Sequence, residues 1–227
     1  MQKKDYMFFD IECCDGKHIC SFGYVICDQN FNLLDKKDIL INPEKPFVLG
    51  PPGCVARVNL AHKAHEFKNQ PKFTFVYPEI KNLIGKQWRM LLGHSIRNDV
   101  RFLNQACMKE NIEPFNIRTF DTQQYYKDLK RDRNPMSLER IIAELGIHAD
   151  GLIPHKSCDD AHLAMLVMKE ICAQYKKTLD DCLIEQGVLV LKGGQNKKRL
   201  RLLCDDTQAE KHLANGVEDV GCRHRTD

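Results

Sequence analysis

The stretch YMFFDIE, residues 6–12, decides the fold that the sequence predicts. It is apolar on both alternating faces until its acidic residues, which is typical of a strand buried at the centre of a sheet. A second strand is predicted over residues 18–27 and, after a turn at residues 28–30, a third near residues 31–41. Short connections between these strands predict an antiparallel meander that opens a mixed sheet.

The following residues alternate between helical and strand-like patterns. Helices are predicted over residues 76–85, 95–109, 136–145 and 158–175, and short strands over residues 90–92 and 117–121. The prolines and glycines of residues 43–53 predict a loop. This order of elements predicts an α/β fold, a mixed sheet flanked by helices.

The periodic pattern weakens after Tyr175. We therefore expect one domain over residues 1–175 and a weakly structured C-terminal extension over residues 176–227. The extension contains a basic cluster at residues 192–201, for which a solvated or disordered segment is favoured over a nucleic-acid patch. Residues 205–227 are expected to form a flexible tail.

The composition is that of an ordinary globular protein. The 227 residues can bury a sizeable core, and a formal charge of +3 neither requires nor excludes a phosphate-rich substrate. The 11 cysteines are odd in number and include no C-x-x-C pair, which argues against a zinc ribbon or a closed disulfide framework. Reduced thiols, and the lack of an apolar signal region or a membrane-length apolar stretch, favour a cytoplasmic protein.

Two acidic residues end the first predicted strand. Asp10 and Glu12 are two positions apart, so both side chains point to one face, with Cα atoms about 6.5–7 Å apart. Carboxylates on a buried strand repel one another and lose hydration unless cations neutralise them. Solvated acids at a frayed strand end are the alternative, which the preceding apolar run disfavours.

A third acid falls on the apolar stripe of a predicted helix. Asp99 shares this inward stripe with Ile96, Leu103 and Ala106. Taken alone, Asp99 could equally be a buried acid that an arginine or a helix cap satisfies.

The fourth acid is one of an adjacent pair. Asp160 shares a helical stripe with Ala164 and Met168, so the spacing favours Asp160 as the inward acid. Asp159 lies on the neighbouring row and is expected to cap its helix or to face water.

Four inward carboxylates predict a site for hard cations. Mg²⁺ and Mn²⁺ prefer oxygen ligands and tolerate retained water. Two such ions about 3.5–4 Å apart can clamp the attacking and leaving oxygens of a phosphodiester displacement. The sequence therefore predicts two divalent cations at Asp10, Glu12, Asp99 and Asp160.

Histidines add a candidate for proton transfer. His155 follows Pro154 and precedes Asp160 by five residues, so we expect it in the loop that enters the helix. A histidine there can take the proton of an attacking water near neutral pH. His94 and His162 are expected to be structural or to face solvent.

Two cysteines follow the first acidic pair. Cys13 and Cys14 could line a pocket for the terminal nucleotide. Inert buried thiols are an alternative that is at least as well supported.

Three short motifs, in order, resemble one enzyme family. FFDIE (8–12), GHSIRNDVRFL (93–103) and HKSCDDA (155–161) are similar to the motifs of the DEDDh (DnaQ-like) 3′→5′ exonucleases, typified by the proofreading epsilon subunit of bacterial DNA polymerase III. The resemblance covers about residues 5–175, including Phe120-Asp121-Thr122 and SLERIIAELGI (137–147). It implies an RNase H-like fold.

The resemblance also implies roles for the matching residues. Asp10, Glu12, Asp99 and Asp160 would hold two Mg²⁺ or Mn²⁺ ions, and His155 would be the general base. The implied reaction releases nucleoside 5′-monophosphates from single-stranded 3′ ends, with DNA proofreading or repair favoured and a DNA polymerase as a possible partner.

The sequence departs from the family pattern near the expected nucleotide pocket. Cys13-Cys14 stands where Thr-Thr is frequent, and Ser95 stands where Asn is usual. The Gly-Ile-Thr element expected near residues 58–66 is not recognisable. These departures concern nucleotide binding and leave the acidic residues intact.

Three alternatives to a DNA exonuclease stay open. The first is an exoribonuclease that trims RNA 3′ ends, because contacts to the 2′-OH cannot be read from the sequence. The second is a catalytically silent nucleic-acid-binding module, which would be expected to lack a ligand or the base. The third is a two-metal endonuclease, which the spacing of His155 and Asp160 disfavours.

Overall fold

The computed structural model describes residues 4–48 and 60–189. Part of the loop expected at residues 43–53, the basic cluster at 192–201 and the tail at 205–227 lie outside these described residues. None of the helices in the described ranges combines the length and apolar character needed to cross a bilayer.

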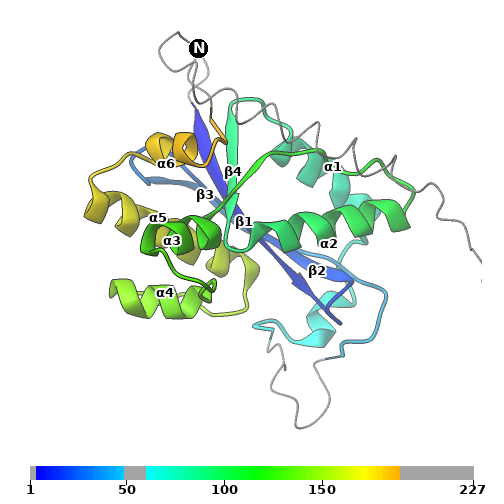
Figure 1. Ribbon diagram of the computed structural model, residues 1–227. Coiled ribbons are helices and arrows are strands. Elements are labelled where there is room, and N and C mark those ends of the chain that lie inside the picture. Colours follow the sequence, from blue (N-terminus) through cyan, green and yellow to red (C-terminus); the bar gives the residue numbers. More distant parts are fainter. Residues whose placement is uncertain (1–3, 49–59, 190–227) are drawn as a thin grey trace, which may run out of the picture. The chain divides into compact units, whose positions relative to one another are not determined.

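A single mixed sheet forms the centre of the fold, with strand order β3-β2-β1-β4-β5 (Figure 1). β1, β2 and β3 pair in antiparallel fashion, whereas β4 pairs parallel to both β1 and β5. The predicted meander and its continuation into a mixed sheet are therefore confirmed. The strands are β1 (Asp5–Cys13), β2 (Ile19–Cys27), β3 (Leu33–Leu40), β4 (Arg89–Gly93) and β5 (Thr119–Asp121).

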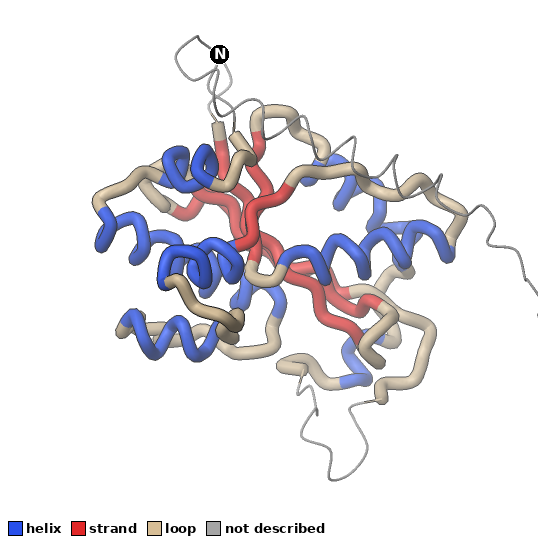
Figure 2. Tube along the Cα trace, in the orientation of Figure 1, coloured by secondary structure: helices blue, strands red, loops and turns tan. Residues whose placement is uncertain are grey.

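Helices cover both faces of this sheet, with α1 and α2 on one side and α3 to α6 on the other (Figures 1 and 2). The four helices that the sequence predicts are present as α1, α2, α4 and α5, whereas α3, α6 and the 3₁₀ helix η1 were not predicted. The elements are η1 (Ala64–Phe67), α1 (Phe73–Ile84), α2 (Ile96–Lys109), α3 (Thr122–Lys130), α4 (Leu138–Leu145), α5 (Ser157–Tyr175) and α6 (Leu179–Glu185).

The central strand β1 is apolar on both faces because both faces are covered. Met7, Phe9 and Ile11 belong to the core beneath α1 and α2, where Phe9 stacks on Phe22 with ring centroids 5.4 Å apart. Phe8 is also fully buried, on the face that α5 covers. Each such side chain contributes about 1.5–3 kcal/mol of burial free energy, so β1 is a fixed platform for the acids that follow.

Gly23 allows α5 to pack closely against the sheet. Gly23 pairs with Asp10 across the β1–β2 ladder, and a Cβ atom there would lie only 2.0 Å from the backbone nitrogen of Cys158. The absence of a side chain therefore lets the first turn of α5 rest on β2. This contact places the acidic residues of α5 beside those of β1.

The folded unit continues beyond the boundary expected at residue 175. Helix α6 buries Leu179, and the hydroxyl of Tyr6 on β1 donates to Oδ1 of Asp180 at 2.7 Å. The compact unit ends at Val188, so α6 belongs to the domain and not to a loosely attached extension.

Candidate nuclease site

The end of β1 provides the first two acids. Asp10 and Glu12 pair with Gly23 and Ser21 of β2, and the ladder becomes irregular directly after Glu12. Both side chains are partly buried and lie on the face that α5 crosses. The strand alternation thus delivers two carboxylates to one face, as predicted.

The third acid reaches the site from the first turn of α2. Asp99 is only 5% exposed, and its Oδ1 accepts a hydrogen bond from the backbone N–H of Ile11 at 3.1 Å. β4 pairs with β1 only as far as Phe8, so this N–H lies beyond the parallel ladder and is available to the carboxylate. The bond ties the start of α2 to the strand between Asp10 and Glu12.

A fifth acid orients the loop that leads into α2. Asp121 caps α3 by accepting from the backbone of Gln123 and Gln124, and its Oδ1 also accepts from the N–H of Ser95 at 3.1 Å. Ser95 has φ of +56°, a left-handed conformation that this bond supports. Asp121 therefore supports the geometry of the site, and its charge also raises the pKa of Asp99.

The fourth acid and the histidine come from the start of α5. The backbone N–H of His155 donates to Oδ2 of Asp160 at 3.0 Å, and Nδ1 of His155 lies 3.9 Å from Oε1 of Glu12. One potential ligand atom from each of Glu12, His155 and Asp160 lies within 4.8 Å of the other two. The His155 side chain is 43% exposed, so its ring is accessible to a substrate.

Burial disfavours the ionised form of all four carboxylates, and repulsion within the cluster adds to this for Asp10, Glu12 and Asp99. Burial, followed by repulsion from Asp99, Glu12 and Asp160, raises the pKa of Asp10 well above its ordinary value, and burial also raises the pKa of Asp99. Burial and the charge of Asp160 raise the pKa of Glu12 to about 8. Burial raises the pKa of Asp160 to about 7, although the His155 N–H opposes the shift.

Cationic side chains do not relieve this repulsion. Within the described ranges, none of the four acids forms an ion pair with Lys or Arg. The ion-pair contact of Glu12 is with the ring of His155. A cluster of oxygen donors with raised pKa values fits hard divalent cations, because the cations would favour the ionised carboxylates.

The expectation for Asp159 was wrong. Asp159 neither caps α5 nor faces water: it is 3% exposed and forms an ion pair with Lys36 of β3. Its Oδ2 also accepts from the backbone N–H of Ile153 at 3.2 Å. The pairing residue lies more than a hundred positions earlier in the chain, so helical periodicity alone did not reveal it.

The two cysteines after Glu12 differ in their surroundings. Cys14 is fully buried in a small apolar cluster with Cys20 and Phe67, and burial raises the pKa of its thiol to about 12. This side chain therefore matches the inert-thiol alternative. Cys13 is partly exposed and packs against the main core.

The remaining predicted histidines lie outside the cluster. His94 is partly buried between the carbonyl of Met136, at 3.2 Å, and the hydroxyl of Thr122, at 3.3 Å. The Nδ1 atom of His162 lies 3.3 Å from Nζ of Lys36. Both contacts are structural.

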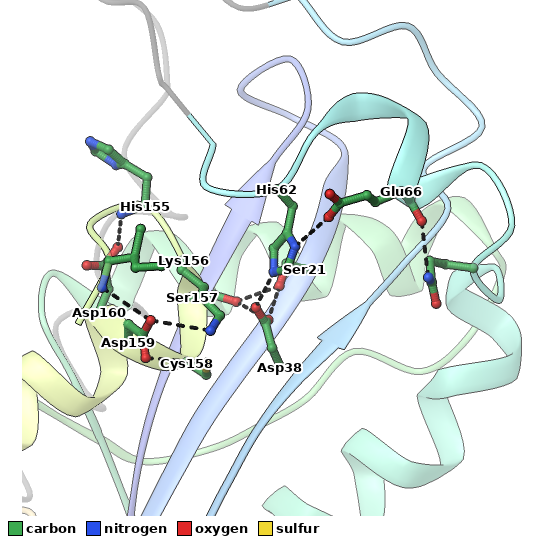
Figure 3. A network of polar contacts seen from close by, with 12 residues as sticks. Ser21, Asp38, His62, Glu66, His155, Lys156, Ser157, Cys158, Asp159 and Asp160 are labelled. Carbon is green, nitrogen blue, oxygen red and sulfur yellow. Dashed lines mark hydrogen bonds and ion pairs between the residues drawn. The ribbon is translucent and has the colours of Figure 1, made fainter. Parts of the chain in front are cut away.

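A polar network beside the acids was not predicted (Figure 3). Asp38 of β3 accepts hydrogen bonds from the hydroxyls of Ser21 and Ser157 and contacts the ring of His62. These partners are far apart in the sequence, so no local pattern signals the network. Side-chain groups already contact both oxygens of Asp38, whereas Asp99 and Asp160 each accept one backbone hydrogen bond.

Solved structures share this fold at low sequence identity. The nuclease domain of 3'hExo, a DEDDh family member bound to rAMP, aligns with a TM-score of 0.63 at 16% identity, covering 85% of this chain and 98% of that chain. E. coli exonuclease I, in a complex with single-stranded DNA, gives 0.65 at 17%, covering 81% of this chain and 43% of its own. Exonuclease X, in complex with 5′-overhanging duplex DNA, gives 0.59 at 14%, covering 77% and 95%.

The fold is thus that of the RNase H-like DEDDh exonucleases. A family model described as "DNA polymerase III subunit epsilon-like, C-terminal domain", of the DEDDh group, matches residues 53–171, more than half of the chain. The chain belongs to this DEDDh exonuclease family. No curated protein sequence matches it.

Proposed function

We propose that the protein is a two-metal-ion 3′→5′ exonuclease that releases nucleoside 5′-monophosphates from single-stranded 3′ ends. The observation that carries this proposal is the convergence of Glu12, His155 and Asp160 within 4.8 Å, next to two further acids that lack cationic partners in the described part of the chain. Membership of the DEDDh family supports the same chemistry.

The four acids would hold Mg²⁺ or Mn²⁺ at the end of β1. Bound cations of this kind stabilise negative charge on a scissile phosphate and on the leaving 3′ oxygen. Asp10 and Glu12 contribute from the strand, whereas Asp99 and Asp160 contribute from the first turns of two helices. Because each of these acids is held on a packed element, their spacing is set before any substrate binds.

His155 is suited to accept the proton of the attacking water. Its ring is exposed, lies beside Glu12, and is carried by a backbone that Asp160 holds. General-base catalysis of this kind usually contributes about 10²–10⁴-fold to a rate. The placement on a loop leaves the ring free to approach a substrate from solvent.

Processing of DNA is the favoured role, and trimming of RNA 3′ ends is the second candidate. Similarity to exonuclease I bound to single-stranded DNA supports the first. Similarity to a 3′-exonuclease that recognises a histone mRNA stem-loop, at 16% identity, supports the second. Both candidates require the same acids and the same polarity of digestion.

Matched substrates test the proposal directly. Single-stranded DNA and RNA of one sequence, labelled at the 5′ end, are incubated with Mg²⁺, with Mn²⁺ or with chelator. We expect a ladder that shortens from the 3′ end, nucleoside 5′-monophosphates as products, and no ladder with chelator or with Asp10→Asn. Binding without any ladder would instead support a silent module, and internal cuts would support an endonuclease.

A further inference from the structure

The polar network beside the acids links a neighbouring segment to His155. We infer that His62 is a positioning residue for His155, and that it acts through the segment 60–67; this inference rests on the proposed function. The residues that form the link, Asp38, His62 and Glu66, are called the His62 clamp below (Figure 3).

The first step is the cross-link that His62 makes. Its Nε2 lies 3.0 Å from Oδ2 of Asp38 and its Nδ1 lies 2.8 Å from Oε2 of Glu66. The His62 ring therefore lies between two carboxylates, one on β3 and one on η1.

The second step fixes the clamp to the body of the domain. Oδ1 of Asp38 accepts from the hydroxyl of Ser157 at 2.7 Å and from the hydroxyl of Ser21. Both serines are buried, Ser157 in the first turn of α5 and Ser21 opposite Glu12 on β2. The His62 ring is thereby attached to the two elements that carry the site.

The third step connects the clamp to His155. Ala61, directly before His62, donates its backbone N–H to the carbonyl oxygen of His155 at 3.0 Å. His155 has φ of +61°, a conformation that non-glycine residues adopt when their surroundings hold them. Ala61 holds its carbonyl and Asp160 holds its N–H, so both sides of the residue are fixed.

A purely structural role for His62 would give different results. The segment is also held by Phe67, which is buried with Cys14 and Cys20 and contacts the His62 ring edge-on at 5.9 Å. If His62 only supported this packing, its loss would lower stability and leave the catalytic step unchanged. Positioning instead predicts an effect on kcat that depends on His155.

The kinetic test compares two neighbouring histidines. We expect His62→Ala to lower kcat by about 5- to 100-fold, with KM changed by less than about twofold, because the base is displaced and the substrate contacts remain. The matched control is His65→Ala, which removes an exposed histidine of η1 and should leave kcat unchanged. In a His155→Ala background, His62→Ala should cause no further loss of kcat.

Hydrogen exchange tests the link without relying on activity. The Ala61 amide should be protected in the wild-type protein, should exchange faster in His62→Ala, and should stay protected in His65→Ala. Glu66→Ala, at a partly exposed side chain, should weaken the protection less and keeps the test decisive if His62→Ala folds poorly.

Three results would overturn the inference. They are an unchanged Ala61 exchange rate in His62→Ala and Glu66→Ala, an unchanged kcat in both variants, or equal losses of kcat with and without His155. A wild-type protein that degrades no 3′ end would contradict the proposed function instead, while the exchange data would still decide whether the clamp exists.

Discussion

The backbone N–H of His155 donates to Oδ2 of Asp160 at 3.0 Å, which joins the proposed base to a proposed metal ligand within a single turn of chain. In the proposed function, the same carboxylate would both hold the loop and bind a cation. A substitution that keeps the acceptor but removes the charge can separate these two tasks.

Asp160→Asn is such a substitution, because the amide oxygen can still accept from the His155 N–H. We expect kcat to fall by at least about 100-fold, since a ligand charge is lost, while Mn²⁺ binding weakens. Thermal stability in chelator at pH 8 should stay the same or rise, because one repelling carboxylate is gone. Asp160→Ala should in addition loosen the loop, seen as faster exchange of the His155 amide.

Asp159→Asn should act on stability. The change leaves Lys36 without its buried partner and weakens the acceptor of the Ile153 N–H, so we expect the free energy of unfolding to fall by about 2–3 kcal/mol. Urea unfolding in the presence of Mn²⁺ measures this. Catalytic loss as large as that of Asp160→Asn, with stability unchanged, would contradict it.

His155→Ala separates the base from the ligands. We expect kcat to fall by about 10²–10⁴-fold, while calorimetric titration still detects Mn²⁺ binding, because the four carboxylates remain. Since Nδ1 of His155 lies 3.9 Å from Oε1 of Glu12, the alternative is a direct role in coordination. Loss of Mn²⁺ binding in this variant would establish that alternative.

Stability without metal should depend on pH. The raised pKa values of Asp160, about 7, and Glu12, about 8, mean that the native state binds more protons than the unfolded chain. This contribution to stability is fully present below the ordinary carboxyl pKa near 4 and is lost as the pH rises through 7 and 8. Melting temperatures in chelator should therefore fall from pH 5 to pH 8.

Cations should remove most of that dependence. Mn²⁺ favours the ionised carboxylates, so the melting temperature at pH 8 should rise strongly when Mn²⁺ is added and change little at pH 5. In chelator, Glu12→Gln should flatten the pH profile. A profile that is flat for the wild-type protein would argue that the acids do not repel one another.

Truncation tests where the domain ends. A chain that ends after Leu189 should fold and degrade short single strands as fast as the full chain, because it retains the compact unit. A chain that ends after Tyr175 loses α6 and the burial of Leu179 and Leu183, each worth about 1.5–3 kcal/mol. It should melt at a lower temperature or be insoluble, which thermal unfolding of the two chains will compare.

Local patterns were sufficient for the main elements and for the acids. Alternation in residues 6–12 predicted a central strand, and the stripe that contains Asp99 predicted its inward position, because both depend on the geometry of a single element. The short helices α3 and α6 were not predicted. The stripe of α3 consists of Thr122, Tyr125 and Tyr126 among polar residues, and α6 spans only 7 residues.

Contacts between residues far apart in the sequence could not be predicted from such local patterns. The ion pair of Asp159 with Lys36, the bonds of Asp38 and the attachment of Tyr6 to Asp180 each join elements far apart in the chain. Periodicity indicates which face of an element is apolar. It does not indicate which charged residue of a distant element lies against that face. The environment of Asp159 was misjudged for this reason, and the packing of α6 against β1 was not foreseen.

The contact between Gly23 and the start of α5 has a consequence for the synthesis of the protein. The acids of β1 leave the ribosome well before the acid and the histidine that complete the cluster, which follow only with the start of α5. A growing chain that has not yet reached His155 therefore has all five strands and three of the four carboxylates, but it lacks His155 and Asp160. Hydrolytic capacity would thus appear late in translation, when the nascent domain is nearly whole.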